Sequence, residues 1–130
     1  METLLRAALL EWLRGDGVLA GLVNAIEEEA PSRASPPWRG IAASASADWS
    51  TKDRKGREVR VALELQGRGD DPASAAEAVR AIEARVEALP RVQDGFAVAN
   101  ATFLRARAEQ RAGNRRVVLL EWRFRVLAAV

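Results

Sequence analysis

The chain has 130 residues, 48% of them hydrophobic, and a formal net charge of +2, which fits one domain with a packed core over residues 1–130. It contains no cysteine, histidine or tyrosine, so disulfide bonds, thiolate zinc sites and catalysis by a cysteine nucleophile or a histidine base are excluded. No apolar run approaches the 18 residues of a membrane span, and acidic Glu2 stands where a secretory signal is basic, so no export signal is expected.

The first predicted element is an amphipathic helix within residues 3–17, with Thr3 as its N-cap and Gly15 as its C-cap. Its buried stripe is formed by apolar residues at helical spacing, namely Leu5, Ala8, Leu9, Trp12 and Leu13. A short second helical stretch is expected over residues 18–26. Three prolines within residues 30–37 then predict a loop.

Two strands joined by a hairpin-like turn are predicted next, over residues 38–46 and 57–66. In the second strand apolar side chains alternate with mostly polar ones, and the apolar set is Val59, Val61, Leu63 and Leu65. This alternation is typical of a sheet that is covered on one face only.

Residues 67–72 read GRGDDP and contain both an RGD tripeptide and a Gly-x-Gly turn before a helix. Cell adhesion through RGD needs an exposed loop tip on an exported protein, which is not expected here. A dinucleotide-binding loop needs a third glycine where Pro72 stands, and Asp70 and Asp71 would repel a phosphate from the helix N-terminus. The stretch is interpreted as a strand-to-helix connection with Asp71 as N-cap and Pro72 at the first helical position.

The most clearly marked helix covers residues 72–89 and buries Ala75, Ala78, Val79, Ile82, Val86 and Leu89. Two more strands follow, over residues 95–110 and 115–130, joined by a turn at residues 111–114. Trp122 and Phe103 are expected in the core. The order of elements predicts an α+β fold with an antiparallel-rich sheet of about four strands and two main helices packed on one face.

Basic side chains gather near the end of the chain: residues 91–130 hold 8 Lys/Arg against 3 Asp/Glu, whereas residues 1–90 hold 12 against 15. Five of the arginines flank the predicted turn at residues 111–114, namely Arg105, Arg107, Arg111, Arg115 and Arg116. The cluster could bind nucleic acid, but it lacks the exposed aromatic residues of a single-strand stacking platform. A solvated or subunit-facing patch is therefore preferred.

Catalytic chemistry is not expected. The serines lack a histidine partner, no Ser-x-x-Lys pattern occurs, and no pair of carboxylates is singled out. The acidic run at residues 27–29 lacks the spaced oxygen ligands of a calcium loop. No catalytic, cofactor-binding or metal-binding residue is predicted.

Three segments together resemble the tail-completion, or tail-terminator, family of long-tailed phages and gene transfer agents. They are LRAALLEWLRGDGVLAGLV (5–23), REVRVALELQGRGDDPASAAEAVRAIEARVEAL (57–89) and VVLLEWRFRV (117–126). Members are similar in having an N-terminal helix followed by D-x-x-L-x-x-L-V, a strand leading into an acidic-capped helix, and a C-terminal strand of alternating aromatic and basic residues.

The resemblance implies a structural protein without a cofactor, located at the tail and head–tail interface of a virion and made in the host cytoplasm. It implies a hexameric ring that caps the tail tube, ends tube polymerisation and joins the tail to the head connector, with DNA passing through. Such a head-to-tail ring needs two complementary surfaces. The candidates are the arginine cluster of one subunit and Glu77, Glu83 and Glu87 of its neighbour. In a second hypothesis the arginines line the lumen of the ring, through which DNA passes. The alternative is a free-standing α+β module that binds nucleic acid or protein.

Overall fold

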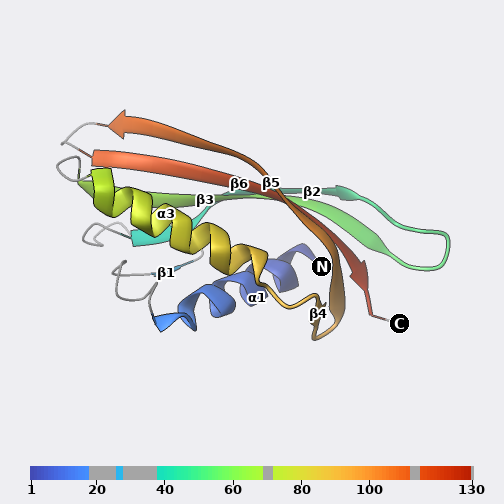
Figure 1. The fold of residues 1–130 in the computed structure, drawn as a ribbon. Helices are drawn as coiled ribbons and strands as arrows, with labels where there is room; N and C mark the ends of the chain where they lie inside the picture. The colour runs from blue at the N-terminus through green and yellow to red at the C-terminus, as the bar shows by residue number, and fades with distance from the viewer. Residues whose placement is uncertain (18–25, 28–37, 69–71, 112–114, 130) are drawn as a thin grey trace.

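The computed structural model describes residues 1–17, 26–27, 38–68, 72–111 and 115–129. In these residues each of two helices is followed by three strands (Figure 1). They are α1 (Glu2–Arg14), β1 (Ile26–Glu27), β2 (Trp38–Asp48), β3 (Gly56–Arg68), α3 (Pro72–Glu87), β4 (Val92–Gln93), β5 (Phe96–Arg111) and β6 (Arg115–Ala128).

All six strands form one sheet in the order β1-β2-β3-β6-β5-β4. The four long strands pair antiparallel with their neighbours, while β1 adds two residues in parallel to one edge and β4 adds two antiparallel residues to the other. Helices α1 and α3 lie side by side on the same face of this sheet (Figure 1). The predicted fold, an antiparallel-rich sheet of about four strands with two helices on one face, is confirmed.

The core lies between the two helices and the sheet face that they cover. On β6, Leu120, Trp122, Phe124 and Val126 are buried, while the alternate residues from Leu119 to Leu127 are partly exposed. Because successive side chains of a strand point to opposite faces, this alternation defines a covered face and an open face. The helices contribute their predicted stripes to the core, with Leu5, Leu9 and Leu13 from α1 and Ala78, Ile82 and Val86 from α3.

A reciprocal contact joins the ends of the two helices. The indole Nε1 of Trp12 donates a hydrogen bond to the carbonyl oxygen of Arg85 at 2.7 Å, and Nε of Arg85 donates to the carbonyl oxygen of Trp12 at 2.9 Å. The Arg85 guanidinium also stacks 3.4 Å from the centre of the Trp12 ring. Both carbonyls belong to the last turns of their helices, where backbone partners become scarce. The Arg85 carbonyl accepts one hydrogen bond from the Ala88 amide at 3.2 Å, and the Trp12 indole gives it a second donor.

Replacing Arg85 by alanine is expected to lower the free energy of unfolding by about 1–2 kcal/mol, because the variant loses a charge-assisted hydrogen bond and a cation–π contact. Arg85→Lys keeps the charge but not the planar stacking, so it is expected to recover only part of the loss. Urea unfolding followed by circular dichroism measures both variants, with Arg80→Ala on the exposed side of α3 as control. Equal effects of Arg85→Ala and Arg80→Ala would contradict the proposed role of the contact.

Several predicted boundaries are wrong at the helix ends. The N-cap of α1 is Met1 rather than Thr3, which lies inside the helix, and Met1 makes no side-chain capping bond. Gly15 is the C-cap as predicted, with right-handed backbone angles. Helix α3 begins at Pro72 as expected but ends at Glu87, two residues early. A helical end at Ile26 is also wrong, because that residue belongs to β1; residues 18–25 lie outside the described residues.

Three predictions about the strands need correction. The glycine-containing stretch does not end β3 at residue 66, since Gly67 and Arg68 still pair with Arg116 and Arg115 of β6; the cap at Asp71 lies outside the described residues. β4 was not expected, and it forms through a tight turn in which Gly95 adopts a φ of 89°, a value that glycine tolerates and other residues rarely adopt. Arg111, placed in a turn by its sequence, ends β5.

Candidate assembly surface

Small and charged side chains lie on the open face of the sheet. Strand pairing sets Arg60 beside Arg123 and Ala62 beside Glu121 in the middle of this face. Glu58 forms ion pairs with Arg125 at 3.2 Å and with Arg123 at 3.5 Å. Two arginines therefore share one carboxylate. The open face has an excess of positive charge at the end of the sheet where β2 and β3 are joined.

Trp49, at the end of β2, adds an aromatic ring beside the same charges. The Arg125 guanidinium lies 5.4 Å from the centre of this ring. Arg54, in the loop between β2 and β3, donates a hydrogen bond from Nε to the carbonyl oxygen of Ala128 at 2.9 Å. These contacts hold the β2–β3 hairpin to the end of β6.

Two of the predicted contact arginines, Arg105 and Arg107, lie on the open face of β5 and are paired within the chain. Arg105 donates to both carboxylate oxygens of Glu121, at 2.9 and 3.2 Å, and this hydrogen bonding raises the pKa of Arg105. Nη2 of Arg107 lies 3.2 Å from Oε1 of Glu109. The Arg105 and Arg107 side chains are 63% and 55% exposed, so water screens each pair, the pair adds little to stability, and each guanidinium has room for another partner.

The structure brings the remaining arginines to one end of the sheet through backbone pairing. Arg111 of β5 is the Cα partner of Arg115 of β6, and Arg116 is the partner of Gln110. The side chains of Arg111, Arg115 and Arg116, and the predicted turn at residues 112–114, lie outside the described residues. The three strands β3, β6 and β5 all reach this end, which we call the arginine end (Arg111, Arg115 and Arg116).

The three predicted glutamates lie elsewhere, on helix α3. Glu77 and Glu87 are exposed and Glu83 is half-buried, and the helix covers the face of the sheet opposite to Arg105 and Arg107 (Figure 1). The glutamates therefore do not share a face of the sheet with Arg105 and Arg107.

Phe103 was expected in the core, and this is wrong: its side chain is 40% exposed. It contacts buried Trp122 edge-on, with ring centres 5.4 Å apart, but it lies on β5 at the margin of the sheet. Leu104 beside it is also exposed, at 37%. Two adjacent large apolar side chains thus stand at the surface of the same edge strand, next to Arg105.

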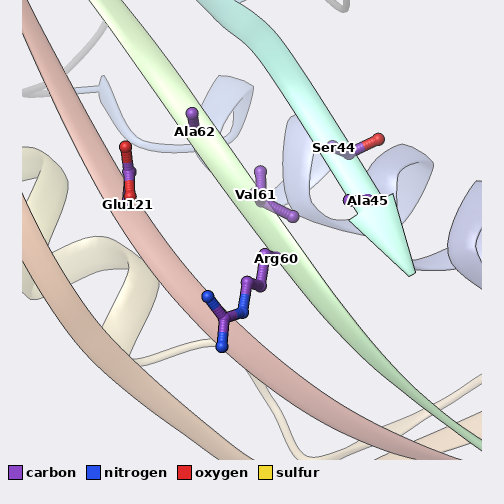
Figure 2. Close-up of a pocket in the computed structure, with 6 residues that line it drawn as sticks. All are labelled: Ser44, Ala45, Arg60, Val61, Ala62 and Glu121. Atoms are coloured by element: carbon purple, nitrogen blue, oxygen red, sulfur yellow. The ribbon is translucent and has the colours of Figure 1, made fainter. Parts of the chain in front are cut away.

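A shallow hollow lies on the sheet and contains the side chains of a serine, an arginine and a glutamate (Figure 2). Its lining residues come from β2, β3 and β6, and they are Ser44, Ala45, Arg60, Val61, Ala62 and Glu121. Ser44 is engaged structurally, because Oγ donates to Oε1 of Glu2 at 2.8 Å and accepts from Nη1 of Arg6 at 3.1 Å. The hydrogen bond from Ser44 holds the pKa of the Glu2 carboxyl below its usual range. Ser44 therefore links α1 to β2 through hydrogen bonds. Its partners are a carboxylate and a guanidinium of α1, and this arrangement is not that of an activated nucleophile.

Within the described ranges, no three acidic side chains gather in a way that could hold a metal ion. None of the helices in the same ranges is long and apolar enough to cross a membrane. The features that stand out are surfaces of charge and an edge strand, which suit contacts with other macromolecules.

Comparison with known proteins identifies the family. Residues 7–127 match the model of the family described as tail completion protein gp17. The chain belongs to this family. A chain in the structure described as the virion of a native gene transfer agent particle has the same fold, with a TM-score of 0.83 and 26% sequence identity over 96% of each chain. A comparison with curated proteins finds no match. The tail completion protein described here is thus a structural protein of a phage-type tail.

Proposed function

We propose that this tail completion protein is the subunit of a ring, a hexamer, that caps the tail tube, ends tube polymerisation and joins the tail to the head connector. The observation that carries the proposal is the match over 96% of both chains to a component of a gene transfer agent virion. Because the same fold spans nearly the whole of both chains, the elements described here have counterparts in that virion component. The partners are further copies of the chain, the major tail tube protein and the head–tail connector or stopper protein.

The role is carried by surfaces and not by catalysis. In a closed head-to-tail ring each subunit uses two different, complementary patches. The arginine end gathers cationic residues where β5 and β6 meet, and α3 carries the acidic residues Glu77, Glu83 and Glu87, so the two sets have opposite charges. We assign them to a contact between the tail completion protein and a neighbouring copy. DNA would pass through the opening of the ring.

Reversing the charge of the arginine end with Arg115→Glu and Arg116→Glu is expected to weaken assembly about tenfold or more per contact, equivalent to about 1.4 kcal/mol. Attraction between opposite charges becomes repulsion, and its screening by salt makes assembly of the unaltered protein salt-sensitive. Native mass spectrometry at several ionic strengths measures the oligomers, and negative-stain microscopy shows whether they are rings. Arg91→Glu, an exposed reversal near β4, is the matched control.

The charge contact between subunits and the capping role of the ring are contradicted by different results. If neither salt nor the double variant Arg115→Glu, Arg116→Glu changes assembly, the proposed charge contact is wrong, although the subunits can still form a ring. Tails that carry the protein without any ring at their end would contradict the capping role itself.

A further inference from the structure

Along much of its two edges, the sheet has backbone N–H and C=O groups that pair with no other strand in the described part of the chain. β1 pairs with Arg39 and Gly40 of β2 only, and β4 pairs with Phe96 and Ala97 of β5 only. In the described part of the chain, no strand pairs with the outer edge of residues 41–48 of β2 or of residues 99–111 of β5, whereas the amide of Val98 donates a hydrogen bond to the carbonyl oxygen of Arg91 at 2.7 Å. Each free edge presents a row of backbone N–H and C=O groups that can accept another strand.

The two free edges lie at the same height on opposite sides of the sheet. Ile41 is level with Ala106, because their partners Leu63 and Leu120 pair with each other. Asp48 is level with Val98 through Arg57 and Val126 in the same way. Residues 41–48 on one edge therefore face outward over nearly the same window as residues 99–106 on the other, and β1 and β4 lie outside this window at its two ends.

Strand direction allows the two edges to join. β2, β3, β6 and β5 alternate in direction across the sheet, since each neighbouring pair is antiparallel. A rotation about a ring axis preserves the direction of every strand relative to that axis, so β2 of the next subunit would run antiparallel to β5. Antiparallel addition is the more stable form of pairing.

The side chains favour pairing of β5 with β2 of the next subunit over pairing of β5 with a second β5. β5 presents Arg105 and Arg107 along its free edge, and a second β5 would bring like charges together. Residues 41–48 contain no cationic side chain and consist mostly of alanine and serine. Such small residues leave space beside exposed Phe103 and Leu104.

We infer that strand β5 of one tail completion subunit pairs with strand β2 of the next copy, so that the sheet continues across the subunit boundary. Residues 99–106 and 41–48 form the contact, and Phe103 and Leu104 become covered there. The inference rests on the proposed ring and adds a backbone contact to the charge contact between the same two neighbours.

Engineered disulfides test this contact directly, because the chain has no cysteine of its own. Ala45 and Thr102 both lie on the open face at one height, being linked through Arg60 and Arg123. Within one subunit two strands separate them, about 14 Å at the usual strand spacing, which no disulfide can span. Any disulfide between these positions therefore joins two subunits.

The experiment uses three double variants in assembled particles: Ala45→Cys combined with Asn100→Cys, Thr102→Cys or Arg105→Cys. Their second positions lie on the open face at successive steps along the window, so the set covers a stagger of two residues in either direction. After mild oxidation, at least one double variant is expected to give a ladder of covalent oligomers on a non-reducing gel that collapses with reductant. Each single variant, and the control Ala88→Cys with Thr102→Cys, is expected to remain monomeric.

The outcomes separate the inference from the ring itself. Rings at the ends of tails without a ladder from any double variant would overturn strand pairing and leave the proposed function standing. Covalent dimers from Thr102→Cys alone would mean that two β5 edges meet, which also overturns it. Tails without rings and variants without ladders would remove both proposals.

Discussion

Trp122→Ala is expected to lower the free energy of unfolding of the tail completion protein by about 3–5 kcal/mol. The Trp122 side chain is 1% exposed and lies in the centre of β6, within the cluster that joins both helices to the sheet. Truncation leaves a cavity that the surrounding strands cannot fill without losing their pairing. Because small domains are stable by only about 5–15 kcal/mol, this change removes a large part of the total. Urea unfolding followed by circular dichroism measures it.

Trp122→Phe is the matched control for this prediction. The indole Nε1 of Trp122 is buried and has no hydrogen-bond partner among the described residues, so removing that donor forfeits no bond. Phenylalanine keeps most of the apolar volume, and the expected loss is below about 1.5 kcal/mol. Equal losses for the two variants would mean that a polar contact, and not the volume of the ring, makes Trp122 important.

Gly56→Ala is expected to lower the free energy of unfolding by about 2–3 kcal/mol, near the upper end of the usual overpacking cost. A Cβ at Gly56 would clash with the carbonyl oxygen of Trp49 and lie 2.9 Å from Cδ2 of Leu127. The backbone cannot move aside easily, because the carbonyl of Gly56 accepts a hydrogen bond from the amide of Trp49 at 3.0 Å. The loss concerns the base of the β2–β3 hairpin, beside the proposed contact with a neighbouring subunit.

Gly17→Ala provides the comparison, since an added Cβ there meets no atom within 4 Å. Its unfolding free energy is expected to stay within about 0.5 kcal/mol of the unaltered protein. Amide hydrogen exchange at Trp49 and at Ala128, whose amide bonds to the carbonyl of Lys55, locates the effect of Gly56→Ala. Unchanged exchange at both amides in this variant would contradict the steric explanation.

Local periodicity explains which elements were predicted well. Most described residues of the α1 and α3 stripes, and the alternation in β3, appear as expected, because 3.6-residue and two-residue spacing place apolar side chains on one face wherever that face is buried. Each of these segments packs against the others, so the local pattern and the tertiary environment agree.

β5 shows why periodicity failed elsewhere. Register shifts interrupt its pairing with β6 between Val98 and Asn100 and between Phe103 and Arg105. The second bulge leaves Phe103 paired with Trp122 on the covered side and Arg105 paired with Glu121 on the open side. In a regular strand these two residues would share a face. An extra residue in a strand has no mark in the sequence, so the ion pair of Arg105 was not predicted. Phe103 stays on the covered side, and its exposure follows from the place of β5 at the margin of the sheet, which the sequence does not reveal either.

The sequence by itself determined the helices, the long strands, the α+β class and the resemblance to tail completion proteins, since these depend on the order and spacing of residue types along the chain. Only the tertiary structure decided which strands form the edges, where β1 and β4 leave them open, and that residues 41–48 lie level with residues 98–106. Strand order and register arise from pairings between segments distant in sequence. The surfaces that a subunit offers to its neighbour therefore become visible only when the sheet is assembled.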